Sequence, residues 1–226
     1  MSIWSKIAEA IAALAKGESL ASIFERLRTP PERSVAFAIA VIALGAKMAK
    51  ADGLVTRDEV TAFREVFSIP PEDEGKAARV FNLARQDVAG FEDYALSVKR
   101  MFGDETEPLC DLMEGLFHIA LADGEYHPGE DEFLERVAAI FGFDERRFKT
   151  IRARFVPDAE RDPFDVLGVP HDASKEEIRA AWRAAVKESH PDQMMARGVP
   201  EEAIKMAEVR MAAINAAWEE INRMRP

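Results

Sequence analysis

The sequence predicts an all-α protein made of two helical parts. Apolar residues recur every three to four positions along most of the 226 residues, and runs of alternating β-branched residues are nearly absent. Residues 156–163 place two prolines among several charges, which is typical of a boundary between domains. We therefore expect N-terminal helices over 1–30, a helical bundle over 31–156, a linker over 157–161 and an antiparallel helical hairpin over 162–226.

The first 30 residues predict two short amphipathic helices, which end near Gly17 and before Pro30-Pro31. The first could lie on a membrane surface, but its polar face has few Lys or Arg residues, so docking on the bundle is favoured. The longest uncharged stretch, Ser34 to Ala46, has 13 residues. Because a membrane span needs roughly 18, this stretch predicts a helix buried on all sides.

Composition excludes several classes of function. A net charge of −11 argues against generic nucleic-acid binding, which needs a basic face. Cys110 is the only cysteine, so an internal disulfide and a thiolate zinc site are excluded. No signal peptide, transmembrane segment, phosphate-binding loop or nucleophile motif is present. We expect a cytoplasmic protein, with a peripheral place at the inner membrane as an alternative, and no enzymatic activity.

An internal repeat with an offset of 71 residues runs through the predicted bundle. One copy begins at Ala51-Asp52-Gly53 and the other at Ala122-Asp123-Gly124, and each has a glutamate seven residues after its aspartate, Glu59 and Glu130. Apolar positions repeat in the same register. The repeat predicts a pseudo-symmetric helical bundle.

The C-terminal part has clear helix boundaries. Ser174 and Glu177 form a capping-box pattern, so a helix should begin at Lys175. It should end by Ser189-His190, because the residue before Pro191 is disfavoured in the α region. Three of its basic residues are spaced four apart on one stripe, away from its apolar face: Arg179, Arg183 and Lys187. A loop with His190, Pro191 and Asp192 should follow, and a last helix should start with Pro200 at its first position.

Four motifs in this part, in order, resemble the DnaJ-type J-domain. They are Asp162-Pro163-Phe164-Asp165-Val166-Leu167-Gly168-Val169, the helix over 175–186, His190-Pro191-Asp192, and Ile214-Asn215-Ala216-Ala217-Trp218-Glu219-Glu220-Ile221. The resemblance implies a DnaK-type chaperone as partner and stimulation of its ATP hydrolysis. It also implies that Asp192 accepts charged hydrogen bonds from the partner, His190 makes polar contacts and Pro191 stiffens the loop. Arg179, Arg183 and Lys187 would then supply electrostatic steering.

The sequence departs from the usual J-domain pattern at several positions. Ala180 and Ala184 occupy places where basic residues are common, and Gln193 follows the tripeptide. Residues 161–226 contain ten Lys or Arg and twelve Asp or Glu, a net charge of −2. These departures predict weaker or more selective docking. Trp182 and Trp218 replace the family's usual tyrosines and are expected in the hairpin core.

The repeated Ala-Asp-Gly…Glu pattern resembles the TerB-like domain, which precedes J-domains of the DjlA-like class. The resemblance implies a divalent metal at Asp52, Glu59, Asp123 and Glu130, although helix capping alone accounts for the glutamates. No other cofactor is expected, and the N-terminal domain could form a homodimer. The alternative function is a metal- or stress-responsive TerB-like scaffold with a weakened J-domain.

Overall fold

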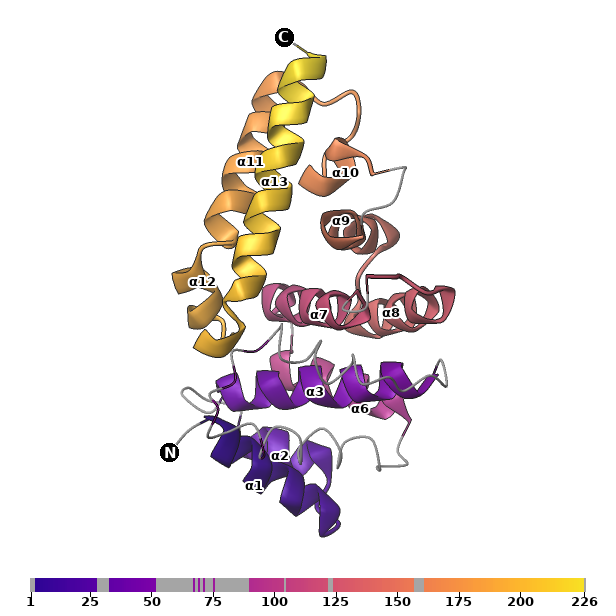
Figure 1. Ribbon diagram of the computed structural model, residues 1–226, viewed down its shortest axis with the longest axis vertical. Helices are drawn as coiled ribbons and strands as arrows, with labels where there is room; N and C mark the ends of the chain where they lie inside the picture. The colour runs from indigo at the N-terminus through magenta and orange to yellow at the C-terminus, as the bar shows by residue number, and fades with distance from the viewer. Residues whose placement is uncertain are drawn as a thin grey trace.

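The computed structural model describes residues 3–27, 33–51, 67, 69, 71, 75, 90–103, 105–121, 124–156 and 161–225. All regular secondary structure within these residues is helical, which confirms the predicted all-α class. The helices form successive layers along the long axis of the molecule, from α1 and α2 at one end to the α11–α13 hairpin at the other (Figure 1).

The N-terminal helices α1 (Ile3–Ala15) and α2 (Leu20–Arg26) pack on the bundle, as predicted. Trp4 and Ile7 are almost fully buried, and the Trp4 ring meets Phe67 edge to face at 5.9 Å between centroids. Ser19 caps α2, since its hydroxyl oxygen accepts a hydrogen bond from the Ser22 amide. The apolar face of α1 therefore contributes to the core.

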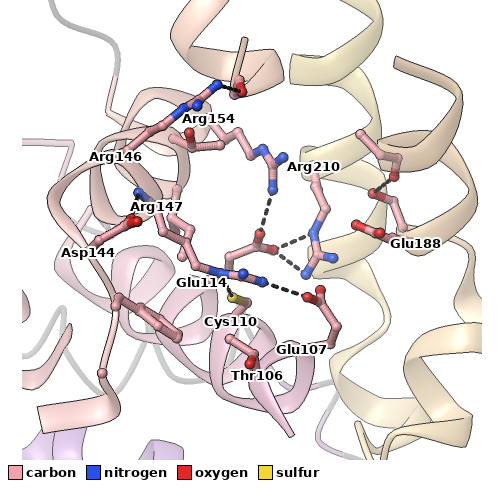
Figure 2. Close-up of a pocket in the computed structure, with 17 residues that line it drawn as sticks. Thr106, Glu107, Cys110, Glu114, Asp144, Arg146, Arg147, Arg154, Glu188 and Arg210 are labelled. Atoms are coloured by element: carbon pink, nitrogen blue, oxygen red, sulfur yellow. Dashed lines mark hydrogen bonds and ion pairs between the residues drawn. The ribbon is translucent and has the colours of Figure 1, made fainter. Parts of the chain in front are cut away.

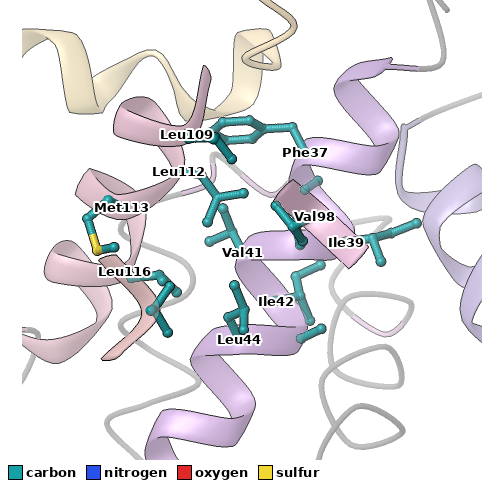
Figure 3. Close-up of a cluster of buried hydrophobic side chains, with 14 of the residues drawn as sticks. Phe37, Ile39, Val41, Ile42, Leu44, Val98, Leu109, Leu112, Met113 and Leu116 are labelled. Carbon is teal, nitrogen blue, oxygen red and sulfur yellow. The ribbon is translucent and has the colours of Figure 1, made fainter. Parts of the chain in front are cut away.

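Helix α3 (Arg33–Ala51) is the central element of the bundle and is buried on all sides from Val35 to Met48, as its uncharged sequence predicted. Figure 3 shows its apolar side chains facing those of α6 (Phe91–Phe102) and α7 (Thr106–Ala120). A Cβ at Gly45 would lie 2.7 Å from Ile119 Cδ1, so this glycine allows α3 and α7 to approach closely.

Helices α8 (Pro128–Phe141) and α9 (Glu145–Phe155) complete the bundle. Gly90 and Gly103 flank α6, and Gly142 ends α8 in the left-handed conformation with φ 84°. The first copy of the predicted repeat lies largely outside the described residues. The second copy spans the connection from α7 to α8.

The C-terminal part contains α10 (Pro163–Leu167), α11 (Lys175–Glu188), α12 (Pro191–Ala196), the 3-10 helix η2 (Glu201–Ala203) and α13 (Lys205–Met224). Helices α11 and α13 form the expected antiparallel hairpin (Figure 1). Trp182 and Trp218 stack between them at 4.9 Å and are half-buried at the edge of the hairpin core. Pro200 caps η2 and does not begin α13, because the chain first makes a 3-10 turn.

The hairpin and the bundle share part of one apolar core. The end of the hairpin near α12 contributes five buried residues to the bundle core: Met194, Val199, Ala203, Met206 and Ala207. The opposite end has a separate core around Phe164, Val166 and Ile214. The tripeptide 190–192 therefore belongs to the end of the hairpin that rests on the bundle.

Candidate functional site

The tripeptide lies at the junction of α11 and α12. His190 has the extended backbone that a residue before proline favours, and Pro191 occupies the first position of α12. The His190 Nδ1 accepts a hydrogen bond of 3.2 Å from the Asp192 amide, so the imidazole caps the helix. The prediction that residues 190–192 form a loop was wrong, because Pro191 is the first residue of the short helix α12.

Both polar side chains of the tripeptide face solvent. The exposed fraction is 59% for the His190 side chain and 77% for that of Asp192, and their Nδ1 and Oδ2 atoms are 3.7 Å apart. The three predicted stripe residues of α11, Arg179, Arg183 and Lys187, are exposed as well. Since Ile178 and Ala185 face the hairpin core, the basic stripe and the tripeptide are both available to a partner.

Two buried residues, Ser189 and Met194, flank the tripeptide in the sequence. Ser189 is fully buried, and its hydroxyl donates a hydrogen bond of 2.6 Å to the Ala185 carbonyl. Met194 is also fully buried and anchors α12 in the bundle core. The sequence indicates only that Ser189 lies at the end of α11 and does not predict its buried hydrogen bond.

Helix α7 presents two fully buried carboxylates, Asp111 and Glu114, to the C-terminal part. Neither was predicted from the sequence. Asp111 accepts hydrogen bonds from Arg197 Nε at 2.9 Å and from Arg210 Nη2 at 2.5 Å. Glu114 accepts from Arg210 Nε at 2.5 Å and pairs with Arg154 of α9 at 3.4 Å. Burial raises the pKa of Glu114, while the charges of Arg210 and Arg154 oppose that shift.

A pocket of about 490 Å³ lies between the bundle and the hairpin, with Glu114 and Cys110 in its lining (Figure 2). Its charged side chains mostly pair with one another. Arg147, for example, donates to Glu107 at 2.5 Å and to the Cys110 sulfur at 3.0 Å. Arg210 of α13 and Glu114 of α7 pair across the pocket, so it is part of the contact between the bundle and the hairpin and carries no assigned ligand.

Of the four predicted metal ligands, Asp52, Glu59 and Asp123 lie outside the described residues. Glu130 is buried in the first turn of α8, where its carboxylate accepts a hydrogen bond of 2.9 Å from the His127 amide. That contact is the capping role given as the alternative to metal binding. Within the described ranges no three His, Cys, Asp or Glu side chains are grouped as metal ligands would be. Metal binding stays a prediction.

Comparisons with known proteins agree with these features. A family model described as tellurite resistance protein TerB matches residues 38–153, and one described as DnaJ domain matches residues 162–223. Co-chaperone protein DjlA of Photobacterium profundum is 27% identical over 218 residues, covering 85% of this chain and 79% of the relative. The protein of the same name from Coxiella burnetii is 28% identical over 198 residues, covering 79% and 73%. No solved structure matches significantly.

The hairpin with its exposed tripeptide, together with the DnaJ match, defines a J-domain protein. The chain belongs to the DjlA-like class, in which a TerB domain precedes a C-terminal J-domain. The bundle is the TerB domain, and the hairpin with α10 and α12 is the J-domain.

The expected location in the cytoplasm, or peripherally at the inner membrane, is wrong, because DjlA homologues are membrane-anchored proteins. That expectation depended on the lack of a long apolar stretch, and such a lack does not determine where a protein resides. Among the residues that the structure describes, no helix is long and apolar enough to span a bilayer.

Proposed function

We propose that this protein is a co-chaperone that docks on a DnaK-type chaperone through the tripeptide and the basic stripe of α11 and stimulates ATP hydrolysis. The J-domain implies a DnaK-type partner, and the curated relatives are named co-chaperones. The observation that carries the proposal is the exposure of His190 and Asp192 beside an exposed basic helix.

The proposed division of roles follows from chemistry. Asp192 offers a solvated carboxylate at the start of α12, which can accept charge-assisted hydrogen bonds from an arginine or lysine of the partner. The α11 cations would speed association with an acidic surface and would contribute less to the lifetime of the complex. Stimulation then requires tighter binding to the hydrolysing conformation of the chaperone than to the other one.

Single-turnover ATP hydrolysis by a DnaK-type chaperone tests the proposal. The wild-type chain should accelerate hydrolysis, and Asp192→Asn and His190→Gln should each reduce the acceleration at least about tenfold, the loss expected for a charge-assisted contact. Asp172→Asn is the matched control, because it removes the same charge from another exposed site of the J-domain. No acceleration by the wild-type chain, with the chaperone responsive to another J-domain, would reject the proposal.

A further inference from the structure

One arginine reaches both ends of the segment that carries the tripeptide. Arg197, at the end of α12, donates from Nε and Nη2 to the two carboxylate oxygens of Asp111 on α7, at 2.9 and 3.1 Å. Its Nη2 also donates to the carbonyl of Glu188, the last residue of α11, at 3.0 Å. Residues 188–197 are therefore closed into a loop by one guanidinium, and that guanidinium is held by the TerB domain.

The anchor for Arg197 is rigid. Asp111 is fully buried and also accepts from Arg210, which is only 3% exposed and in turn contacts Glu114. Charge-assisted hydrogen bonds are stronger in such an environment than in water, and a bidentate arginine pair fixes orientation as well as distance. The Asp111 carboxylate therefore defines where the Arg197 guanidinium lies.

The backbone around Arg197 is fitted to the same surface. Gly198 has φ +99°, and a Cβ there would lie 2.9 Å from Arg33 Cγ of α3, so the turn after α12 lies directly on the TerB domain. Met194, one turn before Gly198, is fully buried in the bundle core. Polar, apolar and backbone contacts thus all attach α12 to the TerB domain and leave His190 and Asp192 exposed.

We propose that Arg197 is a positioning residue for the tripeptide and that α7 of the TerB domain is its support. This inference rests on the proposed function, since it assigns to the TerB domain the task of holding α12 ready to dock. When the segment is not held, only a fraction of the molecules is competent to bind, and the apparent dissociation constant rises by the inverse of that fraction. The maximal stimulated rate is unchanged, because the chaperone orders the segment once it is bound.

The full-length Arg197→Gln variant tests the inference with two readouts. Hydrogen exchange at the amides of Gln193, Met194 and Val199, which are hydrogen-bonded within this segment, should become about tenfold faster. In single-turnover assays, the concentration for half-maximal stimulation should rise about tenfold at an unchanged maximal rate. Arg146→Gln is the matched control, because Arg146 also joins the two domains, but its hydrogen bond of 2.5 Å goes to the Gly168 carbonyl at the end of α10 and not to residues 188–197.

The outcomes separate this inference from the proposed function. Unchanged exchange over residues 193–199 would overturn the inference, and so would faster exchange spread equally over α11, which would indicate general loosening of the hairpin. If wild type does not stimulate the chaperone, the proposed function fails while the exchange result still decides the inference. Arg197→Lys, which keeps the charge but lacks the bidentate fork, should give an intermediate exchange rate and covers the case in which the glutamine variant does not fold.

Discussion

Arg210 of the J-domain and Asp111 of the TerB domain are 99 residues apart in sequence and share a buried hydrogen bond of 2.5 Å. Glu114 lies on the same helix face and binds the same guanidinium. Both carboxylates are fully buried, so neither can recover its hydration if the arginine is removed.

Arg210→Ala should therefore destabilise the protein strongly. Removing one partner of a buried ion pair typically costs about 3–5 kcal/mol, because the remaining charge stays buried. Urea unfolding followed by circular dichroism would measure this loss, with Arg223→Ala on the exposed face of α13 expected within about 0.5 kcal/mol of wild type. A loss below about 1 kcal/mol for Arg210→Ala would show that the cluster contributes little to stability.

His118 should make the stability depend on pH. Burial, assisted by the charge of Arg210, lowers the pKa of this imidazole to about 4 from 6.5, and among the described residues its Nε2 atom has no hydrogen-bond partner. Below pH 6.5 the unfolded chain binds a proton at this site that the folded chain does not. The free energy of unfolding should thus fall by about 3 kcal/mol between pH 6.5 and 4 from this residue alone.

Measuring urea unfolding across that pH range in His118→Gln tests the assignment. The variant should have a flatter profile than wild type. If the free energy of unfolding of His118→Gln changes with pH as steeply as that of wild type, other groups cause the pH dependence.

Cys110 should be chemically inert in the folded protein. Burial raises the pKa of its thiol to about 12, and Arg147, which opposes that shift, donates to the sulfur at 3.0 Å. Because the thiolate is the nucleophile, a disulfide reagent at about pH 8 should not label the native chain on the timescale that labels a free thiol. One equivalent should react in concentrated urea; rapid labelling without urea would contradict the buried environment.

Gly198→Ala tests how closely α12 is fitted to the TerB domain. The positive φ costs an alanine roughly 1–3 kcal/mol, and its Cβ would also meet the Arg33 side chain. The midpoint of urea unfolding should fall accordingly. Gly129→Ala in α8, where an added Cβ meets nothing within 4 Å, should leave the midpoint unchanged or higher. Equal midpoints for the two variants would argue against the close approach.

Local signals in the sequence predicted much of the fold. The Ser174 and Glu177 capping box starts α11 at Lys175, as expected, because both partners lie within one turn of the chain. The buried helix α3 followed from 13 uncharged residues, since no polar face was available for solvent. The sequence also located the tripeptide directly after α11. It did not predict α12, because a proline can either end a helix or occupy the first position of the next one.

The contact between the domains could not be predicted in the same way. Asp111 and Glu114 are charged residues on a helix, a pattern that usually indicates a solvated face. The sequence around Arg197 and Arg210 likewise predicts exposed side chains. Their pairing spans 86 to 99 residues and exists only because the J-domain docks on α7. These charged side chains form a fixed cluster because they are buried, and their burial depends on the tertiary structure.

The affinity of this protein for a DnaK-type chaperone in its two nucleotide states tests the proposed docking directly. Calorimetry would compare an ATP-bound, hydrolysis-deficient chaperone with the ADP-bound form. We predict at least about tenfold tighter binding to the ATP-bound form, and we expect Asp192→Asn to lose this preference, because only a difference in affinity can shift the chaperone's conformational equilibrium. Equal affinity for both states, or an undiminished preference in Asp192→Asn, would contradict it.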